Sequence, residues 1–156
     1  MRIKQSIENT GAVFLKQPVI LNPNGNLRRI FRSIDGEKLP FREIYYSEVN
    51  RKSLKGWKYH RQQTQNISVA YGEIRVVCVL QEIDREVVEV FKVDTKHFYG
   101  VLTIPAGIYY AIINYTNEPT ILLNVTDNLH DPAENKSLPI DTPVFQHLIR
   151  KYGVFE

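Results

Sequence analysis

Short apolar runs recur along most of the chain, and in several of them apolar and polar residues alternate. Examples are REIYYSEV from Arg42, EIRVVCVL from Glu73 and IYYAIINY from Ile108. Turn-forming sequences such as NPNG, DGEKLP and Pro105-Ala106-Gly107 separate these runs. Alternation predicts half-buried strands, and about ten short strands at roughly 8–12-residue spacing are typical of an antiparallel sandwich or barrel.

One segment near the C-terminus has the features of a helix instead. Residues 142–152 have Asp141 or Thr142 as a cap, contain Pro143 in the first turn and end before Gly153. We expect this helix to dock on the barrel or on a partner subunit. Residues 128–140, NLHDPAENKSLPI, lack any periodicity and are predicted to form a surface loop.

The composition indicates a folded domain rather than a membrane or disordered protein. The chain has 156 residues, of which 43% are hydrophobic and 24% charged, so we expect one domain over residues 1–156. It has neither a signal-peptide-like start nor the ~20 consecutive apolar residues of a membrane span, which favours a cytoplasmic location. The single cysteine, Cys78, excludes an internal disulfide and is expected to be buried in a strand.

Charge adds one alternative. The formal net charge is +3, and basic residues are interleaved with aromatic ones in NLRRIFR and NRKSLKGWKYHR. Nucleic acid is one possible partner for such segments, and anionic small molecules such as sugar nucleotides would use the same arginines. Because acidic residues are scattered elsewhere and no basic helix is predicted, we expect neither a nucleic-acid nor a membrane partner.

The stretch KGWKYH carries the first chemical signal. In an extended chain Lys58 and His60 point to one face of the sheet, and Trp57 points to the other. The segments Gly56–Gly72 and Gly100–Asn114 together resemble the two signature motifs of the cupin superfamily. The resemblance implies an all-β cupin jelly roll, or double-stranded β-helix barrel, with a short C-terminal helix.

The metal ligands of the cupin pattern are largely missing. Lys58 stands at the first histidine position, Gln65 near the glutamate and Tyr110 at the last histidine, which leaves His60 alone. A protonated lysine has no lone pair, and one imidazole cannot hold a catalytic metal that ordinarily takes three protein ligands. We therefore expect neither a metal nor another cofactor.

A narrower resemblance covers most of the chain. It is to the dTDP-4-dehydrorhamnose 3,5-epimerase family and related sugar-nucleotide isomerases. Four segments carry it. Asn24–Phe31 is similar to a segment that contacts nucleotide phosphates, and Leu102–Tyr110 is similar to "I-P-x-G-x-x-H-G-F". The other two are Tyr45–Val49 followed by KGW, and Leu122–Asp127 followed by His130-Asp131-Pro132.

This resemblance implies metal-independent acid–base chemistry on a nucleotide-linked 4-keto-6-deoxyhexose in surface polysaccharide biosynthesis. In the family a base removes the proton next to the C4 keto group, a cation steadies the enolate oxygen, and a tyrosine returns a proton. Each positioned acid or base contributes about 10²–10⁴-fold, and histidine suits the task at neutral pH. The family also implies a homodimer with exchanged N-terminal strands.

The chain departs from the family at the reacting positions. The base histidine corresponds to Lys58, the second histidine to Tyr110, and the tyrosine lies near Leu123 or Asn124. A lysine is a poor base unless its surroundings lower its pKa by several units from about 10.4. Either Lys58 is such a lysine, or other groups act, with His60 and His130 as acid–base candidates and Tyr46, Tyr109 or Tyr110 as acids.

Two sets of candidate residues follow. The catalytic candidates are Lys58, His60, Tyr110 and His130. The substrate-binding candidates are Arg28, Tyr46, Gln65, Asn66, Tyr109 and Asn124. Arg28 and Arg29 point to opposite faces of their strand, so at most one of them can reach a phosphate.

Two other functions stay open from the sequence. The missing histidine and tyrosine favour a cupin that binds a sugar nucleotide without converting it, or that serves as a partner subunit. The third possible function is that of a jelly roll that binds sugars or nucleic acids.

Overall fold

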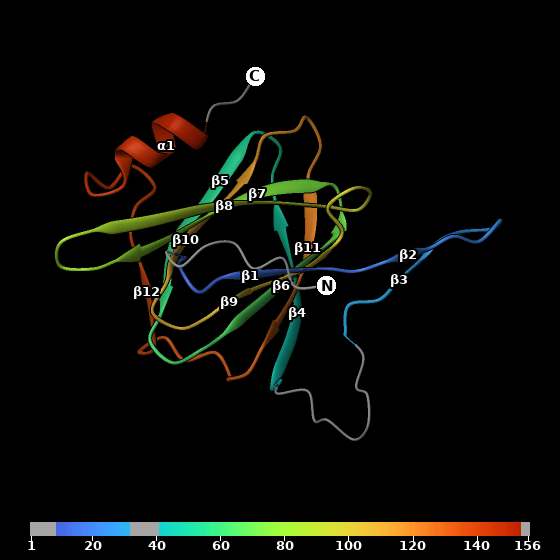
Figure 1. Ribbon diagram of the computed structural model, residues 1–156, viewed down its shortest axis with the longest axis horizontal. Coiled ribbons are helices and arrows are strands. Elements are labelled where there is room, and N and C mark those ends of the chain that lie inside the picture. Colours follow the sequence, from blue (N-terminus) through green and yellow to red (C-terminus); the bar gives the residue numbers. More distant parts are fainter. Residues whose placement is uncertain (1–8, 32–40, 154–156) are drawn as a thin grey trace.

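Two five-stranded antiparallel sheets make up the body of the protein (Figure 1). The computed structural model describes residues 9–31 and 41–153. The first sheet contains, in spatial order, β1 (Val13–Lys16), β9 (Gly100–Ile104), β6 (Gln65–Tyr71), β11 (Thr120–Thr126) and β4 (Glu43–Val49). The second contains β12 (Asn135–Ser137), β5 (Ser53–His60), β10 (Tyr109–Asn114), β7 (Glu73–Gln81) and β8 (Glu86–Asp94).

A small hairpin stands apart from these sheets. Strands β2 (Val19–Ile20) and β3 (Leu27–Arg28) pair only with each other and project away from the body (Figure 1). The predicted strand NLRRIFRS is therefore short. Its last two residues, and the turn DGEKLP, lie outside the described residues.

The core lies between the two sheets and follows the alternation of the sequence. In β7, Ile74, Val76 and Cys78 face the opposite sheet and are fully buried. Val77 and Val79 face the other way and pack in a second apolar cluster. The expected burial of Cys78 is confirmed.

The second cluster is covered by helix α1 (Gln146–Tyr152). Phe145, directly before the helix, packs on Trp57 of β5 with ring centroids 4.7 Å apart. The helix begins four residues later than predicted because residues 142–145 form turns, in which the Phe145 N–H donates to the Thr142 carbonyl. No helix in the described ranges is long and apolar enough to cross a membrane.

The predicted surface loop at residues 128–140 is partly wrong. Its residues Asn135–Ser137 form β12, which pairs with His60, Tyr59 and Lys58 at the edge of the second sheet. A polar Asn-Lys-Ser sequence has low strand propensity, so this strand forms because the β5 edge offers backbone partners. The pairing brings the preceding loop against the end of β5.

Gly100 allows β1 and β9 to approach closely, and its replacement by alanine should be costly. A Cβ at this position would lie 2.2 Å from the Leu15 carbonyl oxygen. We expect Gly100→Ala to lower the free energy of unfolding by about 1–3 kcal/mol, as overpacking does elsewhere. Chemical denaturation measures this. Lys16→Ala, the exposed partner of Gly100 in the register, is the control and should unfold like the unmodified protein. Equal stability of the two variants would contradict the steric argument.

Candidate functional site

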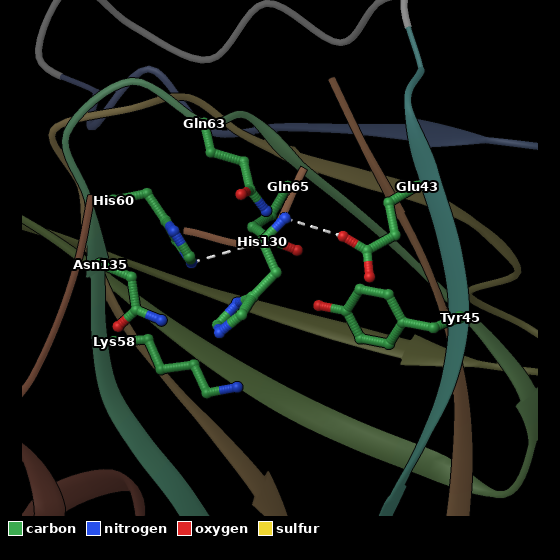
Figure 2. A pocket seen from close by; sticks show the side chains of 8 residues that line it. All are labelled: Glu43, Tyr45, Lys58, His60, Gln63, Gln65, His130 and Asn135. Carbon is green, nitrogen blue, oxygen red and sulfur yellow. Dashed lines mark hydrogen bonds between the residues drawn. The ribbon is translucent and has the colours of Figure 1, made fainter. Parts of the chain in front are cut away.

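A cavity of about 300 Å³ lies between the sheets at one end of the barrel (Figure 2). Its walls come from both sheets, from the connection between β5 and β6 and from the loop between β11 and β12. The lining residues are Glu43, Tyr45, Lys58, His60, Gln63, Gln65, His130 and Asn135.

Strand β5 supplies two of these side chains by simple alternation. Lys58 and His60 both enter the cavity, as their two-residue spacing predicted. Trp57 points the opposite way and is completely buried beneath helix α1. Lys58 is paired with Tyr110 of β10 and His60 with Asn135 of β12, so these four residues share one face of the second sheet.

A buried carboxylate holds His60 in place. Oε2 of Glu134 lies 3.0 Å from His60 Nδ1, and both residues are 7% exposed. The other carboxylate oxygen, Oε1, accepts hydrogen bonds from the backbone N–H groups of Gln62 (2.7 Å) and Gln63 (2.8 Å). Burial by itself raises the pKa of Glu134, but the hydrogen bonds from Gln62, His60 and Gln63 outweigh it and lower the pKa below its ordinary value. Glu134 is therefore an anion at neutral pH.

This carboxylate fixes the imidazole tautomer. A ring nitrogen facing a carboxylate carries the proton, so Nδ1 of His60 donates to Glu134 and Nε2 keeps its lone pair. The Tyr110 hydroxyl and the Gln65 amide nitrogen both lie 3.3 Å from Nε2. The basic nitrogen of His60 is therefore turned toward the inner face of the barrel.

The two tyrosines at the site are proton donors rather than phenolates. Burial is the main cause that raises the pKa of Tyr110 far above its ordinary value. Burial also raises the pKa of Tyr45, with a further increase from the Glu43 carboxylate and a partial offset from a hydrogen bond with Gln65. Both hydroxyls stay protonated at neutral pH and can donate hydrogen bonds.

Lys58 is held in surroundings that disfavour its charge. Burial lowers its pKa, and the nearby positive charge of Lys55 lowers it further. Within the described ranges, its amino group forms no ion pair with a carboxylate. The pKa of Lys58 is therefore shifted in the direction that a basic role requires. Its amine loses a proton more readily than that of an exposed lysine.

His130 enters the cavity from the loop between β11 and β12. Its backbone N–H donates to Oε2 of Glu43 (2.9 Å), which fixes this part of the loop against β4. Figure 2 shows its imidazole extending into the same space as Lys58 and Tyr45. The structure thus brings all four catalytic candidates, Lys58, His60, Tyr110 and His130, to one end of the barrel.

Of the substrate-binding candidates, only Gln65 lines this cavity. Tyr109 lies on the opposite face of β10, where its ring contacts Tyr59 (4.6 Å) and Phe145 (5.2 Å), because adjacent strand residues alternate. Asn66 alternates with Gln65 and hydrogen-bonds to Thr103 outside the barrel. Asn124 faces inward, but its amide donates to Ser47 Oγ (2.9 Å) and it does not line the cavity.

Arg28 and Tyr46 lie together at a different place. They line a second hollow of about 250 Å³ on the outer face of the first sheet, beside the β2–β3 hairpin. The guanidinium of Arg28 donates to the Thr95 carbonyl (2.9 Å) and lies 5.9 Å from the ring centre of Tyr99. Leu123, near the position of the family's tyrosine, also lines this outer hollow.

The sequence reasoning missed Glu134, which is the most strongly bonded carboxylate of the site. It is 74 residues from His60 in the chain and lies in a segment without periodicity, so no local pattern links the two. Glu43, Gln63 and Asn135 also line the cavity and were not among the candidates from the sequence.

The donors at the site do not fit a metal ion. No three His, Cys, Asp or Glu side chains of the described chain are arranged as a ligand set. The inner face of β5 presents an amine where the cupin pattern has its first histidine, and both carboxylate oxygens of Glu134 already accept hydrogen bonds from protein groups.

The fold is shared with a class of known proteins. The chain has the double-stranded β-helix fold of dTDP-sugar epimerases and isomerases over most of its length, which confirms both the expected cupin jelly roll and the resemblance. No family model matches the sequence, and no curated protein matches it.

Three solved structures illustrate the similarity. A dTDP sugar isomerase from Desulfovibrio desulfuricans is 26% identical, with a TM-score of 0.80 over 90% of this chain and 91% of the other. A 3'-monoepimerase from Streptomyces bikiniensis in complex with dTDP-quinovose is 18% identical, with a TM-score of 0.72 over 86% and 72%. The dTDP-4-dehydrorhamnose 3,5-epimerase from Bacillus anthracis with TDP and PPi bound is 15% identical, with a TM-score of 0.75 over 92% and 86%.

Proposed function

We propose that this protein epimerises or isomerises a nucleotide-linked 4-keto-6-deoxyhexose by acid–base chemistry without a metal, in surface polysaccharide biosynthesis. The observation that supports the proposal is the His60–Glu134 pair, whose imidazole lines the cavity between the sheets. The fold around it is shared with dTDP-sugar isomerases and epimerases. An imidazole held in one orientation by a carboxylate is a suitable base for a proton next to a carbonyl.

The surrounding groups suit this chemistry. His60 Nε2 acts as the base, and the protonated Tyr110 hydroxyl beside it supplies a proton donor. His130 is the second acid–base group, reaching the cavity from the loop. Oε1 of Gln65 is buried and has no hydrogen-bond partner in the described ranges, so a substrate hydroxyl is a fitting donor to it.

Solvent-deuterium exchange tests the activity directly. The protein is incubated in D₂O with dTDP- and UDP-linked 4-keto-6-deoxyhexoses, and the sugar is followed by NMR. We expect deuterium at a carbon next to the carbonyl, well above the rate without protein. Absence of exchange with every substrate of this class would refute the proposal.

One observation favours binding without turnover as a second candidate. The base histidine and proton-returning tyrosine of the family are replaced here by Lys58 and, near the second position, by Leu123. A protein with this function would be stabilised against heat by dTDP or UDP and would show no exchange. The same two measurements therefore separate the candidates.

We also propose that the protein is a cytoplasmic homodimer that pairs through the outer face of the first sheet. This face exposes large apolar side chains on its two edge strands and on β11, which include Val13 (49% exposed), Leu15 (41%), Ile44 (52%), Tyr46 (70%) and Ile121 (36%). Their neighbours along each strand, such as Phe14, Tyr45 and Leu122, point inward. Large exposed apolar side chains gathered on one face of a sheet are typical of a protein–protein interface.

Tyr46→Glu should break this dimer. A charge at the centre of an apolar interface must be desolvated without a partner, so we expect monomers at micromolar concentrations where the unmodified protein is dimeric. Sedimentation velocity measures the change. Ile83→Glu is the matched control, because Ile83 is fully exposed in the turn between β7 and β8. A Tyr46→Glu variant that stays dimeric would place the interface elsewhere.

A further inference from the structure

Lys58 has the placement of a nucleophilic amine rather than of a surface cation. Its side chain extends from β5 into the cavity, toward the space also reached by Tyr45 from β4 and His130 from the loop (Figure 2). Two protonatable imidazoles, of His60 and His130, therefore line the same 300 Å³ space as the amine.

The surroundings of Lys58 favour a free lone pair. Burial and the positive charge of Lys55 lower the pKa of its ammonium group. Among the described residues, the salt bridges at this end of the barrel join His60 to Glu134 and leave Lys58 without a carboxylate partner. An amine with these properties attacks carbonyl carbons, as catalytic lysines do.

We propose that Lys58 forms an imine with the keto carbon of the substrate and that this iminium is the electron sink for proton transfer. This inference rests on the proposed function, since it requires a keto sugar in the cavity. It assigns to Lys58 a covalent role in place of the base role that a histidine has at this position in the family pattern.

The covalent step balances without any co-reactant. The Nζ lone pair forms a C–N bond to C4, and the carbonyl π electrons move to oxygen, which takes up a proton from an imidazolium or phenol of the cavity. Nitrogen loses a proton, the oxygen takes a second one and leaves as water, and a C=N⁺ bond forms. Hydrolysis after the isomerisation returns the amine and restores the carbonyl oxygen.

The arrangement on β5 supports the proton transfer that follows. Residues two apart on a strand are separated by roughly 7 Å along its axis and share a face. The Lys58 amine and the His60 imidazole therefore enter the same cavity from one face of β5, where the imidazole can act on a C–H next to the iminium carbon. Removal of that proton gives a neutral enamine, which needs no cation to steady an enolate oxygen.

Reductive trapping tests the inference. The protein is mixed with dTDP-4-keto-6-deoxyglucose and sodium cyanoborohydride, digested and examined by mass spectrometry. We expect the peptide containing Lys58 to gain the mass of the sugar nucleotide less one oxygen atom. Lys58→Arg keeps the positive charge but cannot form the imine, and should lose both the adduct and at least about 10²-fold in exchange rate. Lys136→Arg on β12, whose side chain is exposed, should keep both.

A second measurement on the unmodified protein does not depend on variants that fold. In H₂¹⁸O each imine cycle replaces the C4 oxygen, so ¹⁸O should enter the ketone at least as fast as deuterium enters the neighbouring carbon. Deuterium exchange without an adduct, and with ¹⁸O incorporation at the protein-free rate, would overturn the imine and leave the proposed function standing. Absence of deuterium exchange as well would overturn both.

Discussion

Replacing His60 by glutamine is expected to lower the rate of solvent-deuterium exchange into the keto sugar by about 10²–10⁴-fold, the contribution of one positioned acid–base group. Glutamine cannot accept and carry a proton at neutral pH. Its amide can still donate a hydrogen bond to Glu134, so the buried carboxylate keeps a partner. NMR in D₂O measures the rate, and the melting temperature checks that the variant is folded.

His147→Gln is the matched control for this variant. His147 also pairs with a carboxylate, since its Nε2 lies 2.8 Å from Glu86, but the pair is on the surface at helix α1. We expect unchanged exchange. A His60→Gln variant with the full exchange rate would exclude His60 as the base and leave His130 or Lys58 in that role.

Glu134→Gln should reduce exchange by about 10²-fold or more, toward the roughly 10⁴-fold loss that follows the equivalent change in a catalytic triad. The backbone N–H groups of Gln62 and Gln63 hold the amide oxygen, so the amide nitrogen faces His60 Nδ1 and favours the tautomer that carries its proton on Nε2. The ¹⁵N chemical shifts of the imidazole should accordingly show Nδ1–H in the unmodified protein and mainly Nε2–H in the variant.

These shifts distinguish a positioning role for Glu134 from a structural one. Glu134→Asp keeps the charge and should recover part of the rate, while Glu86→Gln removes the carboxylate of the surface pair and should have no effect. If Glu134→Gln lost activity with the His60 tautomer unchanged, its effect would come from the two backbone N–H groups that it also binds.

Three of the candidate residues on the inner face could be found from the sequence. Lys58, His60 and Tyr110 were placed by their spacing in KGWKYH and in the Gly100–Asn114 segment, and all three lie on the inner face at the site. The choice between Tyr109 and Tyr110 could not be made from periodicity alone. Alternation says that two adjacent residues face opposite ways, but the pairing of β10 with β5 decides which one faces inward.

The positions of residues outside the regular strands could not be predicted from strand periodicity. The contact between Glu134 and His60 depends on β12 pairing with the edge of β5 and on the loop that this pairing draws in. The outer position of Tyr46 likewise depends on which face of β4 meets the second sheet. Apolar and polar residues occur on both faces of β4, so its sequence does not decide this.

The sequence by itself thus determined most of the strands and which side chains share a face, because strand periodicity is a local property of the backbone. The jelly-roll class followed from the resemblance to the cupin motifs. Only the tertiary structure decided that a buried carboxylate stands behind His60 and that Lys58 forms no ion pair with a carboxylate of the described residues. Contacts between distant loops and the local dielectric depend on how the sheets pack, and both control where a proton resides.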